Sequence, residues 1–302
     1  MSLPFSESGS ASSSGEVEAA HSVDGEGEQS STLIFHDHDS AAMVYKQMHD
    51  LRTQGHFCDI TLAVQGREIK AHKIVLASCS SYFRSMLLSG MVESRKDHIE
   101  IKDVDPNSLD ALVNFAYTSS LTITTDNVES LMTAAAMLVF NTAFEACADF
   151  LISQLHPSNC LGIRQFAENL NCTRLVDKSS QFFLHHFLDV IKMEEQYLAL
   201  DAEVFRNLLC SDRINVAYEE KVLEALLQWV EYSPNERKIP FPNLFQCIRL
   251  PLLSPAYIAQ KVESNPFVRE SHKCRDHISL AKDFHLGALG AALSVATTAS
   301  IA

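Results

Sequence analysis

The sequence predicts an α+β fold in which a domain of mixed short strands and helices, residues 36–155, precedes an all-α domain, residues 156–286. Alternating apolar residues, the pattern of half-buried strands, occur in the first range. After His156 and Pro157, apolar residues recur at helical spacing instead, in segments separated by Pro, Asn, Asp or Ser. Hydrophobic residues make up 46% of the 302 residues, which is enough for two cores.

Both ends of the chain differ in composition from these domains. Residues 1–35 consist mainly of Ser, Glu and Gly and bury too little apolar surface to offset the entropy of ordering, which predicts a disordered acidic tail. Residues 287–302 are small and weakly apolar, and their number barely approaches the length of a bilayer span. We therefore expect a low-complexity C-terminal tail and no membrane helix.

The first domain should begin with a helix and a β-hairpin. Ser40 can cap a helix that ends near Gly55. The apolar stripe of this helix consists of Val44, Met48 and Leu51. The following stretch, DITLAVQGREIKAH, predicts two strands joined by a turn at Gln65 and Gly66, with alternate residues of the first strand on one face.

A helical pattern begins again at Lys73. Its continuous apolar stripe is formed by Val75, Leu76, Cys79 and Phe83. This position favours a buried Cys79 thiol over a nucleophile that uses His72 as its base. A strand in HIEIKDV, a helix from Pro106, a short strand over 121–124 and two helices over 126–154 complete the predicted domain.

Charge and cysteine spacing restrict the partners and the compartment. The net charge is -14, and no Lys or Arg precedes Lys46, so binding to a phosphate backbone, and hence to nucleic acid, is not expected. The eight cysteines contain no C-x-x-C and match neither a zinc site nor a compact disulfide framework. With no signal peptide apparent, we expect free buried thiols in the cytoplasm, with the nucleus as a second compartment.

No constellation of residues predicts catalysis. Ser-His-Asp arrangements and Gly-rich phosphate loops are absent in any convincing order. Neighbouring residues on a helix point in different directions, so the pairs at 185–186, 194–195 and 219–220 are interpreted as solvated faces. The run HDHD at 36–39 could hint at a metal but is interpreted as a solvated approach to the next helix. We predict that the chain is not an enzyme and holds no cofactor or metal.

Several stretches resemble a known family. FCDITLAVQGREIKAHKIVLASCSSYFRSML resembles the opening of a BTB (POZ) domain. The stretches HPSNCLGIRQFAENLNCTRLVDKS, EEKVLEALLQWV and IRLPLLSPAYI resemble the BACK domain of kelch-like proteins. The resemblance implies a BTB/POZ domain over 36–155 and a BACK domain over 156–286. It stops at AKDFHL, where blades of a kelch propeller should begin, and no Gly-Gly pair occurs in the chain, so the sequence looks like a truncated or short kelch-like isoform.

The resemblance implies an adaptor function. Kelch-like proteins are substrate adaptors of cullin-3 ubiquitin ligases: the BTB domain dimerises and binds the cullin, and BACK is a helical spacer. The cullin contact implied here is the apolar-x-Glu motif Met91, Val92 and Glu93, together with Tyr117. The alternatives are a solvated loop for the motif and, for Tyr117, a residue that only closes its helix.

The resemblance also implies an isologous dimer with the same chain or with another BTB protein. Its interface would contain the stripe Val44, Met48 and Leu51, with Asp59, His72 and Lys73 nearby. A buried carboxylate at Asp59 would need a partner and could fix the register of the dimer. The competing hypothesis is a scaffold, or a dominant-negative isoform, that pairs with kelch-like relatives without binding a cullin or a substrate.

Overall fold

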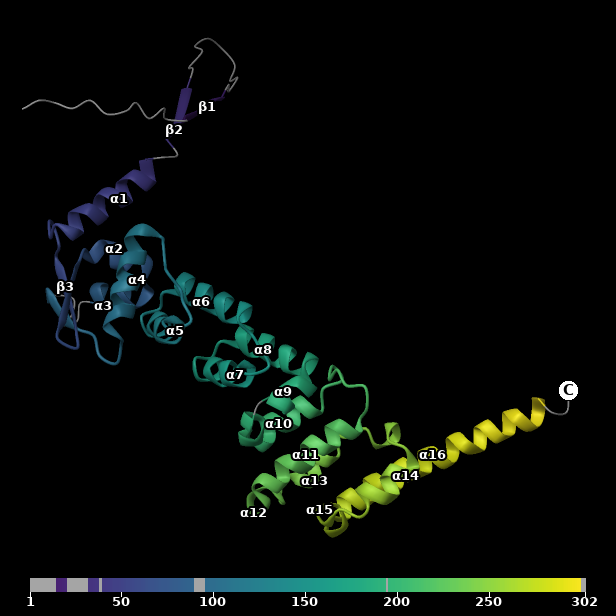
Figure 1. Ribbon diagram of the computed structural model, residues 1–302. Helices are drawn as coiled ribbons and strands as arrows, with labels where there is room; N and C mark the ends of the chain where they lie inside the picture. The colour runs from purple at the N-terminus through teal and green to yellow at the C-terminus, as the bar shows by residue number, and fades with distance from the viewer. Residues whose placement is uncertain (1–14, 21–31, 38–39, 90–95, 194, 300–302) are drawn as a thin grey trace, which may run out of the picture. The chain divides into compact units, whose positions relative to one another are not determined.

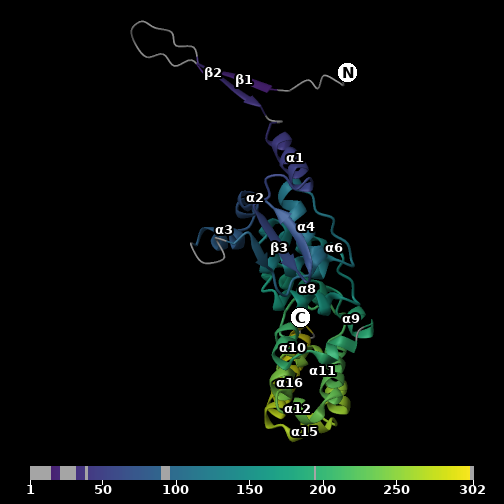
Figure 2. The same ribbon diagram turned by 90° about the vertical axis from the view of Figure 1, so that its left-hand side faces the viewer.

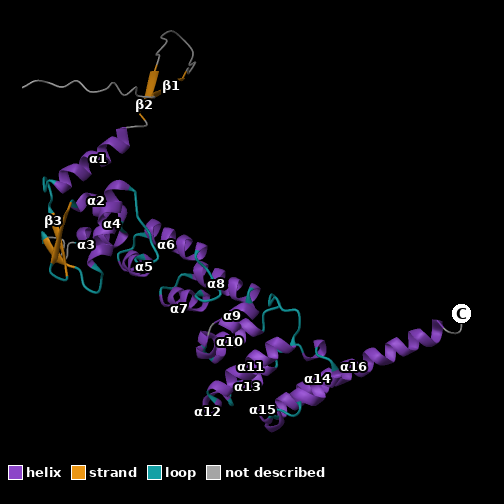
Figure 3. Ribbon diagram, viewed as in Figure 1, coloured by secondary structure: helices purple, strands orange, loops and turns teal. Residues whose placement is uncertain are grey.

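The computed structural model describes all residues except 1–14, 21–31, 38–39, 90–95, 194 and 300–302 (Figure 1). The chain divides into two compact units, residues 1–147 and residues 148–302. Within the described ranges, strands occur only in the first unit (Figure 3). This distribution agrees with the predicted order of an α+β domain and an all-α domain.

In its described part, the first unit contains five strands and the helices α1 to α6. The strands are β1 Gly15–Ala20, β2 Thr32–Asp37, β3 Ile60–Val64, β4 Arg67–Ala71 and β5 His98–Glu100. The helices are α1 Ser40–Thr53, α2 Lys73–Cys79, α3 Ser81–Leu88, α4 Pro106–Thr118, α5 Val128–Met137 and α6 Asn141–Ser153. Helix α6 runs across the division between the units.

The hairpin β3–β4 forms as the sequence predicts. Gln65 and Gly66 both have positive φ, 46° and 82°, the backbone that a two-residue hairpin turn requires. Strand β3 pairs antiparallel with β4 and parallel with β5, which gives the sheet order β4-β3-β5. The alternate residues of β3 are buried: Ile60, Leu62 and Val64. The pairing register of β3 therefore buries the face that the alternating apolar residues predict.

Helix α4 is the central helix of this unit and packs against α1, α2 and β4 (Figures 1 and 2). Asp105 starts it, because its carboxylate accepts a hydrogen bond from the backbone N–H of Ser108 at 2.8 Å and Pro106 occupies the first turn. Ser119 ends it in the left-handed conformation. The residues that α4 contributes to the core include Leu109, Leu112 and Val113.

The predicted strand over 121–124 does not form. The side chain of Asn127 takes the hydrogen bonds that a neighbouring strand would have made: its Oδ1 accepts from the N–H of Thr124 at 2.8 Å, and its Nδ2 donates to the carbonyl of Thr122 at 3.0 Å. Local side-chain bonds of this kind compete with β-ladders. The segment is therefore a capped loop that leads into α5.

Residues expected to lack secondary structure contain the antiparallel pair β1–β2, in which Gly15 lies opposite Asp37. The composition argument overlooked the run from Thr32 to Phe35, whose apolar, β-branched and aromatic residues favour a strand. At the other end of the chain, α16 continues to Ala299, into the range expected to be a low-complexity tail.

The second unit is all-helical in its described part. Its first elements are α7 Cys160–Asn169, α8 Thr173–His185, α9 Phe187–Met193, η2 Glu195–Ala199, α10 Ala202–Leu209, α11 Glu220–Tyr232, α12 Pro234–Arg237 and α13 Phe241–Phe245. The remaining elements are η3 Leu250–Leu252, α14 Pro255–Tyr257, the π-helix η4 Ile258–Val262, α15 Pro266–Glu270 and α16 His272–Ala299. One core joins most of these elements, with Trp229 of α11 among its largest fully buried side chains.

Two features of this unit correct the sequence analysis. Cys210 and Cys247 form a disulfide with their Cα atoms 4.7 Å apart, whereas free thiols were expected. Glu219 is 5% exposed rather than solvated, because its carboxylate accepts a hydrogen bond from the backbone N–H of Arg249 at 2.9 Å and faces the guanidinium at 3.6 Å. Both links join the segment around residue 210–220 to that around 247–249, which lie far apart in sequence.

Candidate functional site

Helix α1 presents an apolar face that the described residues leave exposed. Its amino-terminal end is held by Asp37, whose Oδ1 accepts from the N–H of Ser40 at 3.2 Å. Along the predicted stripe, Val44 is 45% exposed, and Met48 and Leu51 are half-buried. Exposed large apolar side chains next to this stripe are Met43 and Tyr45. Such a cluster is typical of a protein–protein contact surface.

An apolar groove of about 360 Å³ separates α1 from α2. Its lining residues are Val44, Tyr45, Met48, Ile74, Val75, Ser78 and Cys79. Ile74 is 72% exposed on its edge. A second groove on the other side of α2 shares Ile74 and Ser78 and extends to Leu88 at the end of α3. The sequence analysis missed Ile74, although its position off the stripe of Val75 and Leu76 was a signal that it faces outward.

Cys79 lies on this exposed surface, which corrects the expectation of a buried thiol. Ser80 interrupts the predicted continuous helix: it has an extended backbone, and its hydroxyl accepts from the N–H of Phe83 at 3.1 Å while donating to the carbonyl of Leu138 at 2.6 Å. Phe83 remains buried, whereas Cys79 ends α2 beside the groove. Desolvation raises the pKa of the Cys79 thiol, which disfavours a nucleophilic thiolate.

The expected charged group at 59, 72 and 73 forms in part. Asp59 is exposed in the single chain, and its Oδ1 accepts from the backbone N–H of Lys73 at 2.7 Å. The Lys73 ammonium pairs with Asp97 at 2.9 Å instead of Asp59. His72 is buried, 8% exposed. The structure therefore brings Asp59 to the first residue of α2, next to the groove, without burying its carboxylate.

Tyr117 lies inside the unit and not on its surface. It is 1% exposed, and its hydroxyl contacts both the backbone N–H and the ring Nδ1 of His72, at 2.8 and 2.9 Å. The guanidinium of Arg52 lies 5.3 Å from the centre of its ring. Burial raises the pKa of Tyr117 to about 12. Tyr117 is therefore buried in the single chain near the end of α4, and its contact with a cullin stays a prediction beside the alternative that it only closes its helix.

The other expected cullin contacts, Met91, Val92 and Glu93, lie outside the described residues. Among the described residues, no three His, Cys, Asp or Glu side chains come close enough together to hold a metal ion. Within the same ranges, none of the helices combines the length and hydrophobicity of a bilayer-spanning helix.

Family models match both parts of the chain. The BTB/POZ domain matches residues 48–155, and the domain described as BTB And C-terminal Kelch matches residues 160–263. The hairpin, α4 and most of the groove lie within the first match, whereas Val44 and Tyr45 of the groove precede it. Together the two models cover the described helices and strands from α2 to η4.

Among curated proteins, kelch-like protein 17 of Mus musculus is 43% identical over 251 residues, which are 83% of this chain and 38% of that protein. Kelch-like protein 2 of Homo sapiens is 40% identical over 242 residues, 80% of this chain and 41% of that protein. The chain thus spans about two fifths of the length of these relatives. A solved structure, the BTB domain of zebrafish PATZ1, matches 39% of this chain and 94% of its own at 32% identity, with a TM-score of 0.35.

Proposed function

Because the chain belongs to the kelch-like family of BTB–BACK proteins, we propose that it dimerises through its BTB domain and acts as a non-catalytic adaptor that binds cullin-3 in a ubiquitin ligase complex. The chain would position the proteins that it binds and raise their effective concentration, while its partners carry out ubiquitin transfer.

The observation that supports dimerisation is the uncovered apolar face of α1 and its groove against α2. Val44 and Ile74 line this groove and are 45% and 72% exposed in the single chain. Covering these side chains with the same surface of a second copy removes apolar area from water, and a two-fold axis makes the contact self-complementary. Asp59 and Lys73 lie next to the groove and would bound it with polar groups.

The dimer is tested on the full chain by sedimentation equilibrium. Val44→Asp and Ile74→Asp each place a charge in the contact and should shift the dimer to monomer. Ile239→Asp is the matched control, because Ile239 is 83% exposed in the second unit and should leave the dimer unchanged. A wild-type chain that sediments as a monomer at micromolar concentration would contradict the proposed interface.

The cullin contact is tested separately. We expect the full chain to bind an N-terminal fragment of cullin-3, and Met91→Asp combined with Glu93→Lys to abolish this binding with an unchanged melting temperature. Absence of binding by a dimeric wild-type chain would remove the adaptor role but leave the dimer intact.

The second candidate function is a dimerisation scaffold that pairs with kelch-like relatives and does not use a cullin. The burial of Tyr117 favours it, because one of the four residues expected to contact the cullin is not on the surface of the single chain. A pulldown from cells distinguishes the two functions. Recovery of cullin-3 supports the adaptor, and recovery of BTB proteins alone supports the scaffold.

A further inference from the structure

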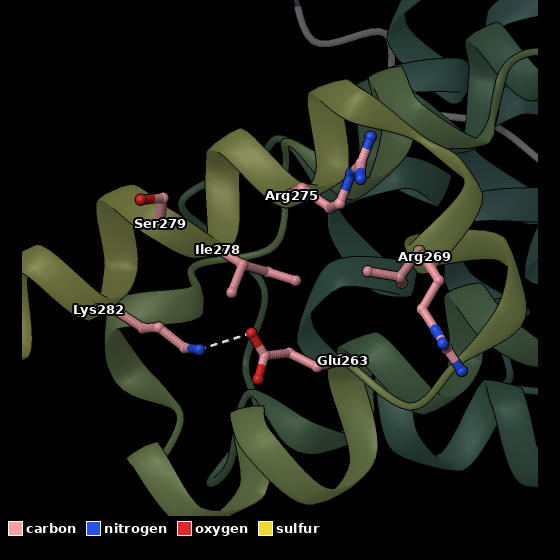
Figure 4. A pocket seen from close by; sticks show the side chains of 7 residues that line it. Glu263, Arg269, Arg275, Ile278, Ser279 and Lys282 are labelled. Carbon is pink, nitrogen blue, oxygen red and sulfur yellow. Dashed lines mark hydrogen bonds and ion pairs between the residues drawn. The ribbon is translucent and has the colours of Figure 1, made fainter.

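A cavity of about 480 Å³ lies in the second unit, beside the last helix (Figure 4). Its lining residues are Glu263, Val268, Arg269, Arg275, Ile278, Ser279 and Lys282. They come from α15, from α16 and from the residue that follows η4. The cavity belongs to neither of the surfaces assigned to dimerisation and cullin binding, and it is independent of the proposed function.

The π-helix η4 positions the acidic side of the cavity. The N–H of Glu263 donates to the carbonyl of Ile258 at 3.0 Å, a bond between residues five apart. Single π-turns of this kind are frequent at functional sites. Here the Glu263 carboxylate reaches the Lys282 ammonium at 2.5 Å, so these two charges neutralise each other (Figure 4).

The positive charge that remains comes from two arginines. Of the neighbouring acids, Glu270 pairs with Lys238, and Asp276 lies beside His272, whose ring is charged only when protonated. Arg269 and Arg275 are exposed, and neither makes an ion pair or a side-chain hydrogen bond with any residue in the described part of the chain. In a chain of net charge -14, these two guanidinium groups are cations without an acidic partner among the described residues.

The shape of the cavity restricts the ligand. Figure 4 shows Ile278 directed into the cavity, whereas the guanidinium groups of Arg269 and Arg275 diverge at its rim. A single phosphate group requires donors that converge on one point, which these two arginines do not provide. An extended acidic segment satisfies them, because its carboxylates are spaced along the backbone. Val268 and Ile278 line the cavity but are only 1% and 3% exposed, so the chain itself already covers them and the arginines supply the contacts with the peptide.

We propose that this cavity binds an extended acidic peptide segment of a partner protein, with carboxylates of the peptide on Arg269 and Arg275. The affinity comes mainly from charge-assisted hydrogen bonds at the rim, so it falls as the salt concentration rises.

The test is fluorescence anisotropy of the full chain with a short labelled peptide composed of glutamate and leucine. The matched peptide has glutamine in place of every glutamate. The wild-type chain should bind the acidic peptide and not the glutamine peptide. Arg269→Glu combined with Arg275→Glu should weaken binding by about tenfold or more. Arg213→Glu, at an exposed arginine elsewhere in the same unit, should leave the affinity unchanged.

Circular dichroism checks that the double variant and the control variant fold. We expect both to fold, because all three arginines are exposed. The proposal is overturned if the wild-type chain does not bind the acidic peptide, or if the double variant binds it as tightly as wild type. If Arg213→Glu weakens peptide binding as much as the double variant does, the loss of affinity reflects the net charge of the chain, and the proposal is overturned as well. Tighter binding of a phosphopeptide that lacks glutamate would assign the cavity to phosphate instead.

Discussion

The hydroxyl oxygen of Tyr117 lies 2.8 Å from the backbone nitrogen of His72 and 2.9 Å from its ring Nδ1, inside the first unit. The other ring nitrogen, Nε2, lies 3.0 Å from the carbonyl oxygen of His56, which can only accept. In a neutral ring Nε2 therefore carries the hydrogen and Nδ1 accepts from the Tyr117 hydroxyl. This hydroxyl joins the end of α4 to the start of α2.

Replacing Tyr117 with Phe should destabilise the chain by about 1–3 kcal/mol, because the N–H and the ring nitrogen of His72 both lose a buried partner. Urea unfolding followed by circular dichroism measures the change. Tyr218→Phe is the control, since Tyr218 is 70% exposed in the second unit and should cost almost nothing. A Tyr117→Phe chain with wild-type stability but lost cullin-3 binding would show instead that the hydroxyl serves a partner.

Stability should fall in alkaline solution through the same hydroxyl. The pKa of Tyr117 is raised from 10.0 to about 12, because burial disfavours the phenolate. The unfolded chain therefore releases this proton before the folded chain does, so the stabilisation is complete below pH 10 and is lost as the pH rises towards 12. The difference amounts to about 3 kcal/mol. Unfolding free energies of wild type and Tyr117→Phe should converge between pH 10 and 12, and a constant difference across this range would contradict the prediction.

Reduction of the Cys210–Cys247 disulfide should lower the melting temperature. The bond closes a separation of 37 residues, for which the loss of loop entropy in the unfolded chain is worth about 4 kcal/mol. The melting temperature of the wild type should therefore fall when dithiothreitol is added. The double variant Cys210→Ser and Cys247→Ser should melt at the reduced value with or without reductant. Cys58→Ser should retain the response to reductant, because Cys58 is a free cysteine. If the wild type melts at the same temperature in both conditions, the disulfide contributes nothing.

Local patterns predicted those parts of the fold that local interactions determine. The hairpin follows from alternation and a Gln-Gly turn, and α4 from Asp105 and Pro106 at its start. The strand expected over 121–124 failed because Asn127, a few residues later, offers its own hydrogen bonds to the segment. The periodicity of apolar residues indicates which side chains are buried. It does not reveal that a side chain can take the backbone hydrogen bonds that a strand would need.

The interaction surfaces were predicted less completely, because they depend on contacts between distant residues. Periodicity placed Cys79 on one stripe with Phe83, but the hydroxyl of Ser80 bonds to Leu138 and breaks the helix between them. The burial of Tyr117 depends on His72, 45 positions earlier in the chain. The family resemblance implied a contact between Tyr117 and a cullin, which stays a prediction. Spacing rules also could not find a disulfide between cysteines 37 residues apart.

Because the helix is interrupted at Ser80, the chain has an exposed cysteine, Cys79, that can be labelled beside the groove. All cysteines lie in the described part of the chain, and of the free ones Cys79 alone is exposed, while Cys58 is half-buried and the others are buried. A maleimide fluorophore added to the native protein should therefore attach first at the groove between α1 and α2. Its emission and its rate of attachment would follow the covering of that groove in real time, with no engineered cysteine.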